Sequence, residues 1–375
     1  MDEILAKLVT AGVPAYGSSI TALDLYRRSR PSPIRFALVL GGLADLAKAF
    51  EELEYPGLPY ADAALDLGPG DGDSGPSSLY LRCADSVSEV EPASFAQLEL
   101  LSGPGSGSFL DPKEAYPSLR AKVLEPRAAA SETLLFDAAV LLSRQDYELP
   151  PHLVPPLPRE LPVRAQRDLL ALMLTGPDPA RGLELLREAG FVAAYWPELA
   201  ALAGVGQAKE FHPEGDAWTH TMETFRHRKI PSLRLSLALL LHDAGKPAAA
   251  SAEGRRFDRH AEIGRSIAER FLRRLGFAPS LVADVSFLIR YHMLPAALPR
   301  LPANRLEGIV DDPRFPILLD LYKCDELSTF KGPDGYYEAC AAYRAWLRNA
   351  RNPWRQADGK KLSRAWLEDR VAATR

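Results

Sequence analysis

Histidine and aspartate residues interrupt apolar helical stripes in the second half of this 375-residue chain, and this pattern constrains its fold more than any other feature. Six of the seven histidines lie between His212 and His292. One of them, His242, is followed directly by Asp243 at the end of the apolar run 232–241. Histidine is the commonest metal ligand, and carboxylates supply oxygen ligands. We therefore expect a divalent-metal site built on helices.

Two further histidines stand where an amphipathic helix would bury them. Apolar residues recur every four positions in 260–275, so His260 lies in the first turn of a predicted helix, near its buried stripe. In the segment that begins at Pro279, apolar residues again recur on one side of a predicted helix. His292 stands at the position where the next apolar residue of this stripe is expected. A lone histidine in such a place is more often a core residue bonded to a backbone carbonyl than a ligand. It is the ordered set of candidates that favours a metal site.

Asp325 completes the set. It shares one face of the predicted helix 315–327 with Leu318 and Tyr322. A carboxylate on an apolar stripe needs a partner, and either a metal ion or a cation such as Lys323 satisfies this need.

Taken together, these residues resemble the ligands of the HD superfamily of metal-dependent phosphohydrolases, which are a histidine, a His-Asp pair and a distant aspartate. The corresponding residues here are His220, His242, Asp243 and Asp325. Within this superfamily, the chain most resembles the HD domain of bacterial tRNA nucleotidyltransferases and poly(A) polymerases. It is carried by the stretches 211–221, 241–247 and 260–264.

The resemblance implies one or two divalent ions and hydrolysis of a phosphate ester. Imidazole and carboxylate ligands suit Mn, Fe, Co, Ni or Zn better than Ca, and Mg is also compatible. Such an ion lowers the pKa of bound water and neutralises phosphate oxygens. His260 and His292 either join Asp243 around a second ion, or contact the phosphate or act as general acids. Lys246 either binds a phosphate oxygen, as a catalytic residue beside Asp243, or complements the end of the preceding helix.

Residues 1–125 are predicted to mix strands and helices, and their pattern is similar to the nucleotidyltransferase head of the same family. The run 17–25 stands where that family has a glycine-rich turn and an Arg-Asp. The family then has an Asp-x-Asp pair for two metals and the nucleotide, whereas this chain has the apolar-rich run 34–38. Without paired carboxylates there is no metal clamp on the transferring phosphate. We therefore expect a degenerate head.

Charge supports this expectation. The window 51–100 contains 11 acidic residues and a single basic one, Arg82. A surface of that sign repels nucleotides and RNA. The run 70–75 satisfies G-x-G-x-x-G, but the strand-like 78–83 follows it rather than a helix, so we predict a hairpin loop. Asp71 and Asp73 in that loop are the one place where transferase carboxylates could stand.

The predicted order of domains is an α+β head, an all-α neck and an all-α HD domain. The neck helix 131–147 resembles that of the nucleotidyltransferases, which read the base with arginines, and it offers only Arg144. Further helices are predicted at 164–175 and 179–190. The boundaries are 1–125 for the head, 126–205 for the neck with a proline-rich linker at 150–162, 206–350 for the HD domain, and 351–375 for a basic tail.

Composition limits the remaining classes. Three cysteines without a pairing motif fit a reducing cytoplasm, and we expect neither a signal peptide nor a membrane-length apolar run. The predicted function is phosphomonoester or phosphodiester hydrolysis on a phosphorylated small molecule, a nucleotide or an RNA end, with tRNA among the candidate partners. Two alternatives stay open, an active tRNA nucleotidyltransferase or poly(A) polymerase, and a non-catalytic RNA-binding or regulatory scaffold. The oligomeric state is open as well.

Overall fold

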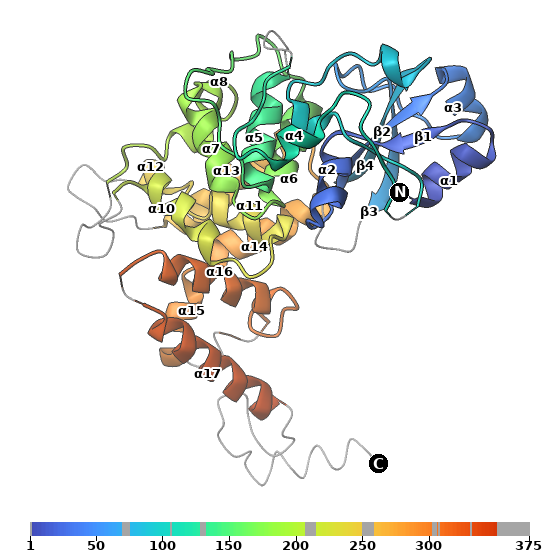
Figure 1. Ribbon diagram of the computed structural model, residues 1–375. Helices are drawn as coiled ribbons and strands as arrows, with labels where there is room; N and C mark the ends of the chain where they lie inside the picture. Colours follow the sequence, from blue (N-terminus) through green and yellow to red (C-terminus); the bar gives the residue numbers. More distant parts are fainter. Residues whose placement is uncertain are drawn as a thin grey trace, which may run out of the picture. The chain divides into compact units, whose positions relative to one another are not determined.

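The computed structural model describes residues 2–69, 76–105, 107–127, 133–206, 215–249, 259–301, 306, 308–330 and 332–350. They form two compact units (Figure 1). The first unit runs from the N-terminus to Ala200 and includes the later segments 230–237 and 270–282. The second comprises 201–229, 238–269 and the described residues from 283 onward.

The first unit contains a six-stranded mixed sheet with the order β3-β4-β2-β1-β5-β6. Strands β2 and β4 are parallel, and the other neighbours are antiparallel. This confirms the predicted mixture of strands and helices in the head. The strands are β1 Ala15–Gly17, β2 Ile34–Leu40, β3 Ala63–Pro69, β4 Pro76–Ala84, β5 Leu101–Ser102 and β6 Phe109–Leu110.

One face of β2 lies in the core of the head. Ala37 and Val39 share a buried apolar cluster with Leu46 of the helix that follows the strand and with Leu5 and Leu8 of the N-terminal helix. Because side chains alternate along a strand, Phe36 and Leu38 lie on the opposite face. The helices of the first unit up to the neck are α1 Asp2–Thr10, α2 Ser19–Arg27, α3 Leu43–Ala49 and α4 Tyr116–Arg120.

In the part of the chain that the structure describes, the elements after the sheet are helices, as predicted. The three helices expected in the neck are present as α5 Leu134–Arg144, α6 Val163–Leu174 and α7 Pro179–Glu188. They are followed by the short helices α8 Phe191–Tyr195 and α9 Pro197–Ala200. The chain between α5 and α6, where the proline-rich linker is predicted, forms neither helix nor strand.

A buried ion pair joins α2 to α5. Arg144 Nη2 donates to Asp24 Oδ2 at 2.6 Å, and both side chains are almost fully buried. The same guanidinium donates to the Leu172 carbonyl and the Thr175 hydroxyl, at 3.0 Å each. A buried charge needs such partners, so the neck arginine stabilises the packing of the first unit.

The second unit is helical, and α11, α13 and α14 contribute residues to both units. The helix predicted at 315–327 is present with those bounds as α16. From α10 onward the helices are α10 Ala217–Thr224, α11 Leu233–Leu241, α12 Lys246–Ala249, α13 His260–Arg274, α14 Pro279–Tyr291, α15 Leu294–Ala297, α16 Phe315–Leu327 and α17 Asp334–Ala350.

One helical stretch departs from the expectation about membranes. Pro279–Arg300 spans 22 residues with a mean hydropathy of 1.3, so it is long and apolar enough to cross a bilayer. Half of its apolar window is buried inside the structure. A single stretch of this kind is weak evidence for a membrane segment, because core helices share these properties.

Several predicted features fall outside the described residues, and the boundaries between head, neck and HD domain remain predictions. The features outside the described residues are the glycine-rich loop 70–75 with Asp71 and Asp73, the stretch 207–214, the loop 250–258 and the basic tail 351–375.

Candidate metal centre

His220 enters the site from α10. Asp216 caps this helix, because its side chain accepts a hydrogen bond from the Thr219 backbone at 2.9 Å. His220 follows in the first turn and is completely buried.

His242 and Asp243 follow directly after α11, and each is only 1% exposed. The apolar helix that precedes them carries them into the interior of the unit, as the sequence predicts. His242 Nδ1 donates to the Leu239 carbonyl at 2.7 Å, because a carbonyl can only accept. Nε2, the other ring nitrogen, therefore faces the site.

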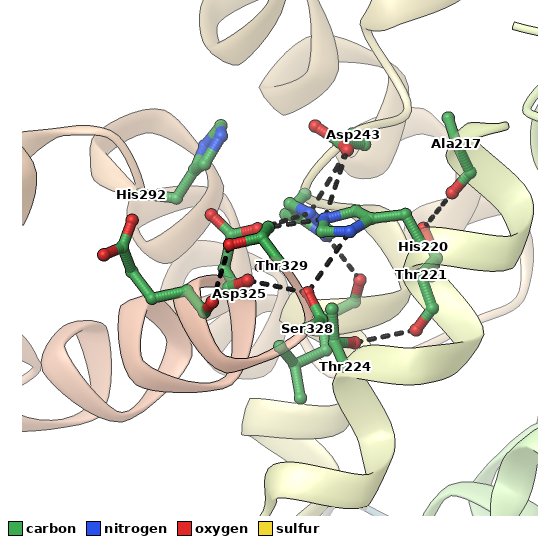
Figure 2. A network of polar contacts seen from close by, with 12 residues as sticks. Ala217, His220, Thr221, Thr224, Asp243, His292, Asp325, Ser328 and Thr329 are labelled. Carbon is green, nitrogen blue, oxygen red and sulfur yellow. Dashed lines mark hydrogen bonds and ion pairs between the residues drawn. The ribbon is translucent and has the colours of Figure 1, made fainter. Parts of the chain in front are cut away.

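The side chain of His242 and three others converge at this place. His242 Nε2 lies 3.3 Å from Asp243 Oδ2 and 3.8 Å from Asp325 Oδ1. His220 Nε2 lies 2.9 Å from Asp325 Oδ1 and 3.9 Å from Asp243 Oδ2. Figure 2 shows Asp325 of α16 and His220 of α10 directed at each other, with Asp243 beside them. The four residues predicted as ligands thus meet in one place.

Ser328 adds a contact that the sequence did not predict. Its hydroxyl donates to the Asp325 carbonyl at 2.6 Å, and its oxygen lies 3.2 Å from His220 Nδ1 (Figure 2). With its own proton engaged, the hydroxyl accepts from Nδ1–H of His220. Nε2 of the same ring lies 2.9 Å from an Asp325 oxygen, close enough for a hydrogen bond or for both atoms to ligate one cation.

A second group of candidate ligands adjoins the first. Asp243, His260 and His292 each offer an atom, and these atoms lie within 4.8 Å of one another. His260 Nε2 is 3.9 Å from Asp243 Oδ1 and 3.1 Å from His292 Nε2. Like His242, His292 donates from Nδ1 to a backbone carbonyl, that of Ile289, at 2.7 Å. Asp243 therefore belongs to both groups, with one oxygen toward each.

Electrostatics prepares these groups for a cation. Burial would raise the pKa of Asp243, but His242, Lys246 and His220 hold it well below its ordinary value. Burial opposes ionisation of Asp325 too, yet the hydrogen bond from His220 and the nearby His242 lower its pKa. At neutral pH both carboxyl groups are therefore charged, the form that binds metals.

His292 differs from the carboxyl groups in the direction of its shift. Burial, together with the neighbouring rings of His242 and His260, lowers the pKa of His292 to about 4. The ring is therefore neutral at physiological pH, as a metal ligand must be.

Unsatisfied atoms test whether the residues fit a metal. Nε2 of His242 and Oδ2 of Asp243 are buried and make no hydrogen bond with any described residue. Lys246 Nζ lies 2.6 Å from that same Asp243 oxygen as an ion pair, outside hydrogen-bond geometry. Buried polar atoms without hydrogen-bond partners are rare in native proteins, and His242 Nε2 beside the charged Asp243 oxygen fits a bound cation.

Close packing fixes the approach of α13 to this site. A Cβ atom on Gly245 would lie 2.0 Å from the His260 carbonyl oxygen and 2.6 Å from the Gly264 nitrogen. Only glycine permits this approach of two backbones. The first turn of α13, with His260, is thereby held against the turn that carries Asp243 and Lys246.

The described residues of the first unit include no comparable set of ligands. Within the described ranges, groups of three or more ligating side chains occur only at the two places above. The face of β2 that would carry the transferase carboxylates presents Phe36 and Leu38 to a cavity of about 390 Å³. These residues do not fit a pair of metal ions.

The comparisons with known proteins agree with this geometry. Residues 218–328 match the family model described as HD domain. The chain contains an HD domain. The match begins two residues before His220 and ends at Ser328, so it includes every residue of the candidate centre.

Two curated relatives resemble part of the chain. The multifunctional CCA protein of Halorhodospira halophila is 41% identical over 127 residues, which are 33% of this chain and 30% of that protein. The CC-adding tRNA nucleotidyltransferase of Thermus thermophilus is 39% identical over 158 residues, 40% of this chain and 35% of that enzyme. The chain therefore matches only about a third of the length of each relative.

Solved structures resemble the whole chain in fold. The CCA-adding enzyme of Bacillus stearothermophilus in complex with CTP has a TM-score of 0.53 at 15% identity, over 100% of this chain and 90% of that one. A tRNA-processing enzyme in an apo form has a TM-score of 0.50 at 14% identity, over 100% and 95%. The HD domain behind a nucleotidyltransferase-like head is thus confirmed as architecture.

Proposed function

We propose that the second unit is a metal-dependent phosphohydrolase that acts on a phosphate ester of a nucleotide or an RNA end. The observation that carries the proposal is the convergence of six ligating side chains around two buried atoms without hydrogen-bond partners, Nε2 of His242 and Oδ2 of Asp243. In this proposal, His220, His242, Asp243 and Asp325 hold one divalent ion. His260 and His292 hold a second ion with Asp243, or bind the phosphate.

A divalent ion bound here supplies positive charge for phosphate oxygens and activates water for attack on phosphorus. The protein residues supply the remaining functions. Lys246 places an ammonium group next to Asp243, where it offsets negative charge on an incoming phosphate. The side chains of Asp325 and His260, at 20% and 13% exposure, are more accessible than the fully buried His220 and His242. His260 is thus placed to give a proton to the leaving oxygen.

A second candidate is nucleotidyl transfer to the 3′ end of tRNA, with tRNA and nucleoside triphosphates as partners. The comparisons favour this function more directly than hydrolysis, because the names of both curated relatives refer to CCA or CC addition and neither refers to a hydrolase. The fold also suits it. Phe36 and Leu38 argue against it, and in this candidate its carboxylates come from elsewhere, such as Asp71 and Asp73.

Two assays on one protein sample separate these functions. The first measures hydrolysis of bis-p-nitrophenyl phosphate, p-nitrophenyl phosphate and 2′,3′-cyclic nucleotides with Mn, Ni, Co or Mg. The second measures incorporation of CTP and ATP into tRNA that lacks its 3′ end. We expect hydrolysis that requires a metal and disappears in His242→Ala, without incorporation.

The other outcomes each have a clear meaning. Incorporation that persists in His242→Ala would establish the transferase and overturn the hydrolase. Absence of both activities, together with absence of bound divalent metal, would leave the scaffold alternative that the sequence also allows.

A further inference from the structure

His220 differs from two other buried histidines of the centre in the partner of its Nδ1 nitrogen. His242 and His292 each donate from Nδ1 to the backbone carbonyl three residues earlier, at 2.7 Å. A carbonyl only accepts, so Nδ1 carries a proton in both rings. Nδ1 of His220 instead faces the Ser328 hydroxyl, at 3.2 Å. A hydroxyl donates as well as accepts, so either nitrogen of a neutral His220 can carry the proton.

Ser328 has a second partner, to which its hydroxyl can turn. Its Oγ lies 2.6 Å from the Asp325 carbonyl oxygen. That carbonyl also accepts from the Ser328 backbone N–H at 3.2 Å, so it keeps a donor when the hydroxyl turns toward His220. His220 is completely buried and Ser328 is 7% exposed, so bulk water does not compete for these bonds. The position of the His220 proton therefore decides which way the hydroxyl points.

The two positions of this proton give the site two states (Figure 2). With the proton on Nε2, His220 donates to Asp325 Oδ1 at 2.9 Å, and Ser328 donates to the bare Nδ1. With the proton on Nδ1, Ser328 accepts it and donates to the Asp325 carbonyl, so Nε2 and Oδ1 are both available to one cation. The proton lost from Nε2 goes to water and the proton gained at Nδ1 comes from water. The ring is neutral in both states.

We propose that Ser328 is a positioning residue that admits the metal ion to His220. In the metal-free protein, the hydrogen bond from His220 to Asp325 closes the site. When metal binds, the Ser328 hydroxyl turns, accepts the proton of Nδ1 and leaves Nε2 as a ligand. This role rests on the metal centre of the proposed function, but not on the reaction assigned to it.

Nuclear magnetic resonance of the full chain tests this role directly. Long-range proton–nitrogen correlations of isotope-labelled histidine report which ring nitrogen carries the proton, and His220→Asn identifies the signals. At neutral pH we expect His220 to carry Nε2–H in EDTA and Nδ1–H with Zn²⁺, whereas His242 and His292 carry Nδ1–H in EDTA. A proton on Nδ1 of His220 in EDTA would overturn the proposal, and so would Nε2–H that persists in excess Zn²⁺.

Variants of Ser328 separate positioning from packing. Ser328→Ala removes the acceptor of the Nδ1 proton, so we expect Zn²⁺ to bind about tenfold more weakly, with Nε2–H of His220 unchanged in EDTA. Ser328→Thr keeps the hydroxyl and is expected to restore the affinity of the wild type. Thr329→Ala is the matched control, because the Thr329 hydroxyl bonds the Glu326 carbonyl. A folded Ser328→Ala protein with wild-type affinity would contradict the role, as would a folded Ser328→Thr protein that binds as weakly as Ser328→Ala.

Hydrolysis assays on the same samples keep this role apart from the proposed function. If the His220 proton moves when Zn²⁺ binds but no phosphate ester is hydrolysed, the proposed function fails and the role of Ser328 stands. If esters are hydrolysed but the proton does not move, the role of Ser328 fails alone.

Discussion

The two units differ in the side chains that they bury at the places where the resemblance implies metal ions. In the second unit, His242 and Asp243 are buried in a cluster of converging imidazole and carboxylate side chains. In the first unit, the strand β2 brings Phe36 and Leu38 to the place where the resemblance implies carboxylates. A cation stabilises the first arrangement and gains nothing from the second. The difference teaches that a shared fold does not distribute chemistry evenly, and we therefore place the proposed metal chemistry in the second unit.

The largest effect is expected from removing the negative charge of Asp243, which both groups of candidate ligands share. Asp243→Asn keeps the shape of the side chain but not its charge, so each group loses an anionic ligand. We expect the rate of metal-dependent hydrolysis to fall by at least about 10³-fold, or roughly 4 kcal/mol in barrier height. Steady-state kinetics with bis-p-nitrophenyl phosphate measures the change, and circular dichroism controls for folding. A loss of hydrolysis rate smaller than tenfold would contradict the proposed difference between the two units.

The second largest effect is expected from a substitution that places a carboxylate in the first unit. Leu38 is 3% exposed, so Leu38→Asp buries a charge without a built partner. We expect the free energy of unfolding to fall by roughly 4 kcal/mol, without gain of CTP incorporation. Urea denaturation measures it, with Leu38→Met as the volume-matched control, for which less than about 1.5 kcal/mol is expected. A stable Leu38→Asp protein that binds Mg would show that the head still has a metal site.

The third effect concerns a carboxyl group that lines the cavity. Burial raises the pKa of Asp137 to about 6, against the hydrogen bonds from Ser94 and Thr133 that lower it. The folded chain therefore holds this proton more tightly than the unfolded chain, whose carboxyl has the ordinary value of 3.8. Its contribution to stability is complete below that value and is lost as the pH rises through about 6.

Comparison of two proteins isolates this contribution. Asp137→Asn cannot titrate, so the difference in unfolding free energy between wild type and variant should change by on the order of 2 kcal/mol between pH 4 and pH 7. The wild type is expected to lose stability relative to the variant as the pH rises. A difference that stays constant with pH would show that Asp137 is charged in the fold.

The smallest effect tests the orientation of one ligand. Ser328→Ala removes the oxygen that accepts from Nδ1 of His220 at 3.2 Å. Residues that orient a metal ligand in this way contribute to affinity, so we expect divalent metal to bind about tenfold more weakly. Competition with a chelating dye measures the affinity. Thr329→Ala, which removes a hydroxyl bonded to the Glu326 carbonyl, is the neighbouring control and is expected to bind metal as the wild type does.

The sequence predicted which residues of the candidate centre come together, but it did not predict the cavity. The candidate ligands stand on helices with clear apolar periodicity or directly after them, and this periodicity directs His292 and Asp325 toward the other ligands. Ser328 escaped prediction because a serine three residues after Asp325 has no distinctive pattern. The cavity escaped because its walls come from β2, β4, α5 and the loops between them, which only tertiary packing brings together.

The sequence also predicted an apolar strand at the place where the resemblance implies carboxylates. An apolar strand in place of an Asp-x-Asp pair is visible in the chain itself, and β2 is present over Ile34–Leu40 as this strand. The unsatisfied atoms of His242 and Asp243 could not be predicted in the same way, because hydrogen-bond partners depend on neighbours that are distant in sequence.

The central claim is that divalent metal binds in the second unit and nowhere in the first. Elemental analysis of protein dialysed against Mn or Ni tests it most directly, on the wild type and on a His242→Ala/Asp243→Ala double variant. The account predicts one or two bound ions per chain in the wild type and none in the double variant. Full metal content in a folded double variant would contradict it and move the metal chemistry to another part of the chain.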